Sequence, residues 1–154
     1  MRKICNVVAI ILTAAIILTC MTGCFGEKGA VNKLLNKFEA ACRAADADAI
    51  LDCINPTIAN PVRSTLSLFG VGSLNSALDT VLGLVGLIDL GNSNPAEVLS
   101  SVRITPKSHT FNSEKNKCDV AVEVIYSTGT QTVTNMYIVS CAKYADEWYI
   151  TSIG

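Results

Sequence analysis

The 154-residue chain carries 12 basic and 13 acidic side chains, a formal charge of −1 at pH 7, and half of its residues are hydrophobic. The chain is slightly acidic and has no cluster of lysine and arginine, so it lacks the basic patch that nucleic-acid binding requires. No nucleic-acid partner is predicted. A chain of this length forms one domain around a single core once any leader is removed.

The start of the chain has the layout of an export signal. Two basic residues are followed by an uncharged apolar run over residues 4–18, and the small pair Thr22-Gly23 stands directly before Cys24. The same length could span a bilayer as an uncleaved anchor. No basic cluster of the stop-transfer kind follows it, however, so the pattern favours cleavage before Cys24.

Residues 21–24, Met-Thr-Gly-Cys, resemble the lipobox of bacterial lipoproteins. The resemblance implies that the Cys24 thiol receives a diacylglyceryl group and that Cys24 then begins the mature chain. Two or more acyl chains, at about 0.8 kcal/mol per buried CH2, hold a protein stably on a membrane. We therefore expect a lipid-anchored protein on the extracytoplasmic face of the cell membrane, with a signal peptide (1–23), a tether (24–29) and one domain (30–154).

Four of the seven cysteines lie in the predicted domain, namely Cys42, Cys53, Cys118 and Cys141. An even number of cysteines in an exported domain favours disulfides, and buried reduced thiols are the alternative. No two of these four cysteines have the short spacing of a zinc site, and the chain contains a single histidine. Neither a metal nor a cofactor is predicted.

Helical periodicity begins at the start of the domain. Over residues 30–45 one stripe is apolar, and it consists of Val31, Leu34, Leu35, Phe38, Cys42 and Ala45. Asp46 is a predicted N-cap for a second, short helix that Asn55-Pro56 ends. Asn60-Pro61 is predicted to start a third helix that runs to Phe69.

Within residues 74–91, apolar positions recur at helical spacing, and the resulting helix would be apolar on nearly every side. Two aspartates and two glycines within this segment argue against a second membrane span, so we expect it to be buried beneath the sheet. Asn94-Pro95-Ala96-Glu97 has the form of a capping box and predicts one more helical turn.

After these helices the pattern changes from period 3.6 to period 2. Strands are predicted over residues 102–111, interrupted by Pro106, and then over residues 117–127, 131–143 and 147–153. Helices followed by an antiparallel meander predict an α+β fold, with N-terminal helices packed on one face of a sheet of about four strands.

The turn between the two middle strands predicts their register. If residues 129–130 form a two-residue hairpin loop, the numbers of paired residues sum to 259, and Cys118 lies opposite Cys141. One face of the hairpin is then apolar almost throughout. We therefore predict a disulfide between Cys118 and Cys141 and, by elimination, a second between Cys42 and Cys53.

Three stretches carry a family resemblance: the Val31-x2-Leu34-Leu35-x2-Phe38 helix, the Ala45-Asp46-Ala47-Asp48-Ala49 link and the Asp146-Glu147-Trp148-Tyr149-Ile150 strand. They are similar to small exported lipoproteins of the nuclear-transport-factor-two-like, cystatin-like cone superfamily, in particular to the lumazine-binding-like lipoprotein group. The resemblance implies a curved, cone-like sheet wrapped around the long first helix. It implies no particular chemistry, because such cones serve as enzymes, binding pockets and interaction modules.

Few residues are candidates for catalysis. His109 has no nucleophile or carboxylate near it in the sequence, so we expect it to be a surface residue. The aspartates at positions 46, 48 and 52 fit helix capping and first-turn charge, because the glycine and glutamate of a calcium loop are missing.

Tyr126, Asn135 and Tyr137 share the predicted inward face and are candidate pocket residues. Cone enzymes of the resembling superfamily often pair an acidic residue with a tyrosine inside the cone. Glu123 points to the other face of the predicted strand, so the general base is missing.

We predict a non-catalytic binding or interaction module whose partner is a small apolar ligand or another envelope protein. The alternatives are a small enzyme on the same scaffold and a carrier of a small apolar ligand. An inward acidic residue near Tyr126 or Tyr137 would favour the enzyme. A cone interior filled by the apolar residues 74–88 would favour the interaction role.

Overall fold

A computed structural model of the protein describes residues 26–68, 95–129 and 131–154. The chain divides into the compact units Met1–Ala30 and Val31–Gly154, and the fold is that of the second unit. The lipobox-like residues 21–24 and the predicted apolar helix of residues 74–91 lie outside the described residues. The described elements after the first helix are α2 (Ala47–Leu51), α3 (Pro56–Leu68), α5 (Pro95–Ser101), β1 (Arg103–Phe111), β2 (Lys117–Thr128), β3 (Gln131–Tyr144) and β4 (Glu147–Ile153).

Within the described residues, the first helix covers residues 26–43. Every member of its predicted apolar stripe is buried, as the helical period requires. The helix ends where Ala45 adopts a left-handed φ of 51°. The Asp46 N–H donates to the Ala41 carbonyl at 3.1 Å and the Ala45 N–H donates to the Cys42 carbonyl at 2.9 Å, which is the Schellman pattern of a helix C-terminus.

The next two helices are capped by side chains. The Asp46 carboxylate accepts from the Ala49 N–H at 3.0 Å and begins α2, as predicted. The Asn55 side chain accepts from the Thr57 N–H at 3.0 Å, and α3 starts at Pro56. The predicted start at Asn60-Pro61 was wrong because the earlier Asn-Pro pair already supplies both a cap and a first-turn proline, and Pro61 lies inside the helix.

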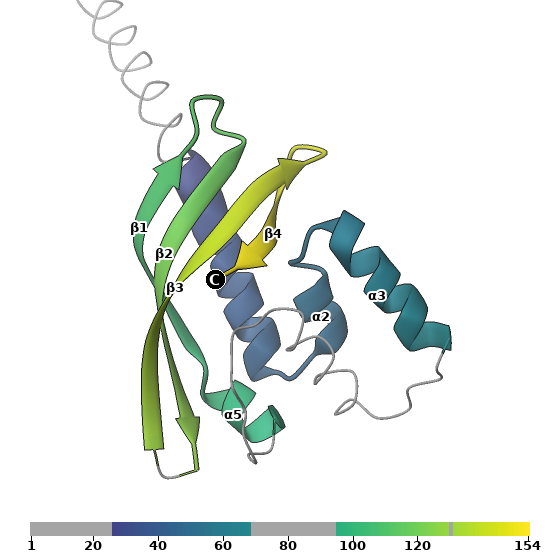
Figure 1. Ribbon diagram of the computed structural model, residues 1–154, viewed down its shortest axis with the longest axis vertical. Helices are drawn as coiled ribbons and strands as arrows, with labels where there is room; N and C mark the ends of the chain where they lie inside the picture. Colours follow the sequence, from purple (N-terminus) through teal and green to yellow (C-terminus); the bar gives the residue numbers. More distant parts are fainter. Residues whose placement is uncertain (1–25, 69–94, 130) are drawn as a thin grey trace, which may run out of the picture. The chain divides into compact units, whose positions relative to one another are not determined.

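The strands form one antiparallel sheet in the order β1-β2-β3-β4, with helices on one face (Figure 1). The predicted register of the middle hairpin is confirmed: Cys118 pairs with Cys141, Val120 with Val139 and Tyr126 with Val133. Gly129 adopts a left-handed φ of 63°, which a tight hairpin turn requires. The predicted α+β fold with a sheet of four strands is therefore confirmed.

A β-bulge in β1 changes which of its side chains face the helices. The register between β1 and β2 shifts between Pro106 and Ser108. Ile104, before the bulge, pairs with the buried Val124, whereas His109, after it, pairs with the buried Val120. An extra residue in one strand reverses the alternation beyond it. The second half of β1 therefore turns its odd-numbered residues inward.

Polar contacts attach the helices to the sheet around this apolar core. The Glu39 carboxylate of the first helix accepts from the Ile104 N–H of β1 at 2.8 Å. The chain after α2 forms a bridge with β4: the Ile150 N–H donates to the Cys53 carbonyl and the Asn55 N–H donates to the Ile150 carbonyl, both at 2.8 Å. Both edge strands of the sheet, β1 and β4, are therefore hydrogen-bonded to the helical layer.

Glu39→Ala should lower the free energy of unfolding by about 1–3 kcal/mol, because the Ile104 N–H loses a charged acceptor in a partly buried place. Glu39→Gln keeps an acceptor and should lose less. Urea denaturation followed by circular dichroism measures the difference, with Lys37→Ala on the exposed side of the same helix as control. Equal losses for the alanine and glutamine variants would contradict the role given to the acceptor.

Candidate functional site

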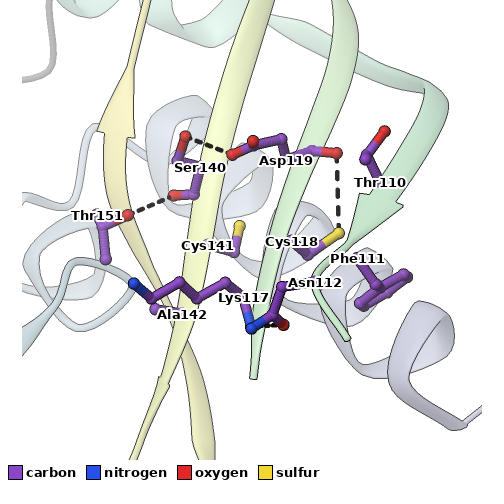
Figure 2. Close-up of a pocket in the computed structure, with 10 residues that line it drawn as sticks. All are labelled: Thr110, Phe111, Asn112, Lys117, Cys118, Asp119, Ser140, Cys141, Ala142 and Thr151. Carbon is purple, nitrogen blue, oxygen red and sulfur yellow. Dashed lines mark hydrogen bonds between the residues drawn. The ribbon is translucent and has the colours of Figure 1, made fainter. Parts of the chain in front are cut away.

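A hollow of about 570 Å³ lies on the outer face of the sheet, away from the helices (Figure 2). Alternation along the strands explains its composition, because Lys117 and Asp119 point outward while Cys118 and Val120 are buried. The outward side chains that line it come from all four strands and the first turn: Thr110, Asn112, Lys117, Asp119, Ser140, Ala142 and Thr151.

Small side chains and a second bulge produce the depression. Ser140 and Ala142 leave little bulk on β3, and the register between β3 and β4 shifts beside Ser140. Thr151 lies in this irregular part of β4, and its hydroxyl donates to the Ser140 carbonyl at 3.0 Å. The hollow therefore depends on how the strands are placed against each other.

The hollow contains one carboxylate and one ammonium group. The Ser140 hydroxyl donates to the Asp119 carboxylate at 2.7 Å, which orients the acid across β2 and β3. The Lys117 side chain extends from β2 over β3, above Ala142 (Figure 2). Asn112 fixes the adjoining turn, since its side-chain oxygen accepts from the Asn116 and Lys117 N–H groups at 3.0 and 2.9 Å. The positive charge of Lys117 offsets the negative charge of Asp119, so the residues that line the hollow carry no net charge.

Two tyrosines adjoin the hollow on the same face. Tyr149 of β4 pairs with Ala142, and its ring meets that of Tyr144 edge-on, at a centroid distance of 6.4 Å. The Tyr149 hydroxyl donates to the Glu147 carboxylate at 2.8 Å, and this hydrogen bond raises the pKa of Tyr149. The phenol is therefore protonated and held in one orientation at neutral pH.

The candidate pocket residues lie elsewhere. Tyr126 is buried in the core, Asn135 is exposed, and the Asn135 amide donates to the Tyr137 hydroxyl at 3.3 Å. None of the three lines the hollow. The hollow was not predicted, because the candidate residues were those of the inward face. The signal that could have found it is the register, which places Asp119 opposite Ser140 on the outward face.

His109 is not the surface residue that we expected. Because of the bulge in β1 it faces the helices, where its Nε2 lies 2.7 Å from the Asn32 side-chain oxygen of the first helix. Its ring stacks on Phe111 at 6.4 Å, and Phe111 meets Trp148 edge-on at 6.0 Å. The histidine therefore takes part in the packing of the helix on the sheet.

Comparisons with known proteins concern the fold alone. No family model and no curated protein matches the sequence. The chain is similar to the crystal structure of an NTF-2-like protein of unknown function from Shewanella oneidensis MR-1, with a TM-score of 0.54 and 15% identity, over 82% of this chain and 95% of that one. The fold is NTF2-like. The solution structure of a SEC-C motif-containing protein from Rhodopseudomonas palustris has a TM-score of 0.49 and 12% identity, over 79% of this chain and 74% of that one.

Among the residues that the structure describes, no helix is long and apolar enough to cross a membrane. The same residues contain no group of histidine, cysteine, aspartate and glutamate side chains that could hold a metal ion.

The four described cysteines are buried free thiols, so the structure contains neither of the disulfides that we predicted among them. Strand pairing and core packing hold Cys118 opposite Cys141 without a bridge. Burial raises the pKa of Cys118 to about 11, with Asp119 adding to it, and burial raises that of Cys141 to about 12, with Cys118 adding to it. In these surroundings the thiolate that attacks disulfides is scarce.

Cys42 and Cys53, which lie in the helical layer, are likewise buried thiols with raised pKa values. Burial raises the pKa of Cys42 to about 12, with Cys53 as the next cause, and burial raises that of Cys53 to about 11. The Cys53 thiol donates to the Ala49 carbonyl at 3.4 Å. Each thiol pair is therefore unreactive in the folded, reduced protein.

In protein kept reduced with a phosphine at pH 8, iodoacetamide should leave these four cysteines unmodified, because pKa values near 11–12 leave on the order of 0.1% thiolate or less and burial blocks access. Raising the pH by one unit should raise any residual rate about tenfold, since thiolate increases with pH below the pKa. Peptide mass mapping reads each cysteine, and the urea-unfolded protein is the control. Prompt alkylation of Cys118 in the folded protein would contradict this assignment.

Proposed function

We propose that this protein is an extracytoplasmic lipoprotein, held on the cell membrane by acyl chains on Cys24, and that its NTF2-like domain is a non-catalytic binding module. The anchor is inferred from the basic start, the apolar run and the Met-Thr-Gly-Cys sequence at residues 21–24.

No aspartate, glutamate, lysine, arginine or histidine among the described residues is fully buried, and this supports a non-catalytic role most directly. General acid–base catalysis needs a titratable group whose surroundings shift its pKa toward the working pH. The described groups with raised pKa values are the four thiols and Tyr149, and each shift leads away from neutrality.

The two side chains nearest to a catalytic pattern have structural partners. Glu39 is inward-facing on the first helix, but its carboxylate accepts the Ile104 N–H. His109 is inward-facing on β1, and its Nε2 meets Asn32. Both contacts join the helix to the sheet, so neither side chain is placed to move a proton to or from a ligand.

Lipidation can be tested on the full chain expressed in a bacterial host. The wild type should be recovered from membranes, with an intact mass that corresponds to a chain beginning at Cys24 plus acyl groups. Cys24→Ser should remove the acyl mass, because the modified thiol is gone, and Cys20→Ser should leave it unchanged, because that cysteine lies in the removed signal. A wild-type chain that retains Met1 would refute the lipoprotein proposal.

We also propose that both thiol pairs become disulfides after export. Each pair would pass two electrons and two protons to the disulfide of an exported thiol oxidoreductase, which is thereby reduced to a dithiol while the new disulfide forms. The strand register, which places Cys118 directly opposite Cys141, supports the first partnership, and Cys42 and Cys53 are then the two cysteines that remain in the domain. The high thiol pKa values imply that oxidation precedes complete folding.

Non-reducing peptide mapping of natively exported protein should recover Cys118 joined to Cys141 and Cys42 joined to Cys53. The first bridge closes a 24-residue loop, so it should stabilise the domain by about 3 kcal/mol in the chain-entropy model, less any strain. Urea denaturation of the double variant Cys118→Ala, Cys141→Ala measures this difference. Recovery of all four thiols unpaired from exported protein would refute the bridges.

A further inference from the structure

We propose that the hollow on the outer face of the sheet binds a neutral oligosaccharide. This inference rests on the proposed binding function and names its ligand class and its place. It assigns recognition to side chains from the outer face of all four strands, which lie on the opposite side of the sheet from the helices.

The shape of the hollow suits a ligand of more than one sugar ring. Its volume of about 570 Å³ falls within the range of roughly 300–1,000 Å³ found for small-molecule sites. Ser140 and Ala142 give it a floor of small side chains, and Thr110, Lys117 and Asp119 are exposed at its sides. A ligand can therefore enter from solvent without any movement of the core.

The polar groups suit hydroxyls. Thr110, Asp119 and Ser140 stand opposite one another across β1, β2 and β3, which places a hydroxyl, a carboxylate and a hydroxyl in one row. A carboxylate offers two oxygens that can accept hydrogen bonds from neighbouring hydroxyls, and bonds to an ionised acceptor are the stronger kind. The Ser140 hydroxyl already orients Asp119 at 2.7 Å, so the acid is held in place before the ligand arrives.

The charge balance favours a neutral ligand. Lys117 and Asp119 line the same hollow and carry opposite charges. An anion such as phosphate would be placed beside Asp119, and a cation would be placed beside Lys117. Unfavourable charge contacts of this kind discriminate against the wrong ligand. A sugar hydroxyl can accept from the lysine and donate to the aspartate, so it satisfies both.

Tyr149 supplies an aromatic surface at the border of the hollow. Its position opposite Ala142 brings the ring beside the floor, and its hydroxyl is held by Glu147. Tyr144 supports the ring edge-on and is 49% exposed. Tyrosine combines a rigid apolar face with a polar end, which suits the C–H face and the hydroxyl rim of a sugar ring.

The test uses the full 15N-labelled protein in micelles of lauryldimethylamine oxide, a detergent without a sugar headgroup. Cellotriose, N,N′,N″-triacetylchitotriose and maltotriose, all neutral, are titrated to about 10 mM, above the weak-binding range near 1 mM, while amide shifts are recorded by NMR. At least one trisaccharide should shift the amides of Ser140, Ala142 and Thr151. Dialanine and inorganic phosphate, as zwitterionic and anionic probes, should not.

Four variants locate the contacts. Asp119→Ala and Tyr149→Ala should each weaken binding about tenfold or more, because one loses the acceptor and the other the aromatic face. Ala142→Leu should abolish binding by filling the floor, while its half-buried position spares the core. Thr105→Ala, exposed on the same face of β1 but outside the hollow, should bind like the wild type, and thermal melting should show that all four variants are folded.

Each contrary result is specific. The absence of shifts with every trisaccharide, or stronger shifts with dialanine or phosphate, would overturn the ligand class. Shifts confined to helix-facing residues such as Tyr126 and Tyr137 would overturn the site but leave the proposed binding function standing. Shortening of the trisaccharide during the titration would instead refute the non-catalytic function and leave the assignment of the hollow intact.

Discussion

The register between β2 and β3 is the constraint on which the rest of the structure depends. Side chains alternate along a strand with a period of two, so a slip of one residue would move Val120, Val122 and Val124 from the core to solvent. The turn at Gly129 and the apolar stripe of the first helix both require the same pairing. Local turn geometry and burial of the helix therefore favour one arrangement together, which is the consistency expected of a well-specified fold.

The outer face follows from the same constraint. Once the valines of β2 face the helices, Lys117 and Asp119 must face away, and Ser140 and Ala142 of β3 must lie beside them. The inner face requires bulk to fill the core, but the outer face has no such requirement and can carry small side chains. The hollow and the core are therefore two results of one pattern, and a change of register would remove both.

The sequence was sufficient where the signal is local and periodic. The helix stripe, the Asp46 cap and the hairpin register were predicted, because each depends on residues close together in the chain or on a simple alternation. The sequence was insufficient where the pairing of two strands determines which way a side chain points. The bulge beside Pro106 turns His109 inward and the irregularity beside Ser140 shapes the hollow, and both appear only when neighbouring strands are placed in register.

The thiol pair connects the two faces. Cys118 lies between Lys117 and Asp119 in β2, and Cys141 lies between Ser140 and Ala142 in β3, so the cysteines share their backbone with the outward side chains of the hollow. A covalent bridge between them would restrain the two strands at the position where Asp119 and Ser140 interact. Because the strands carry core packing on one side and the polar row on the other, a restraint that stabilises the core would also preorganise the outer face.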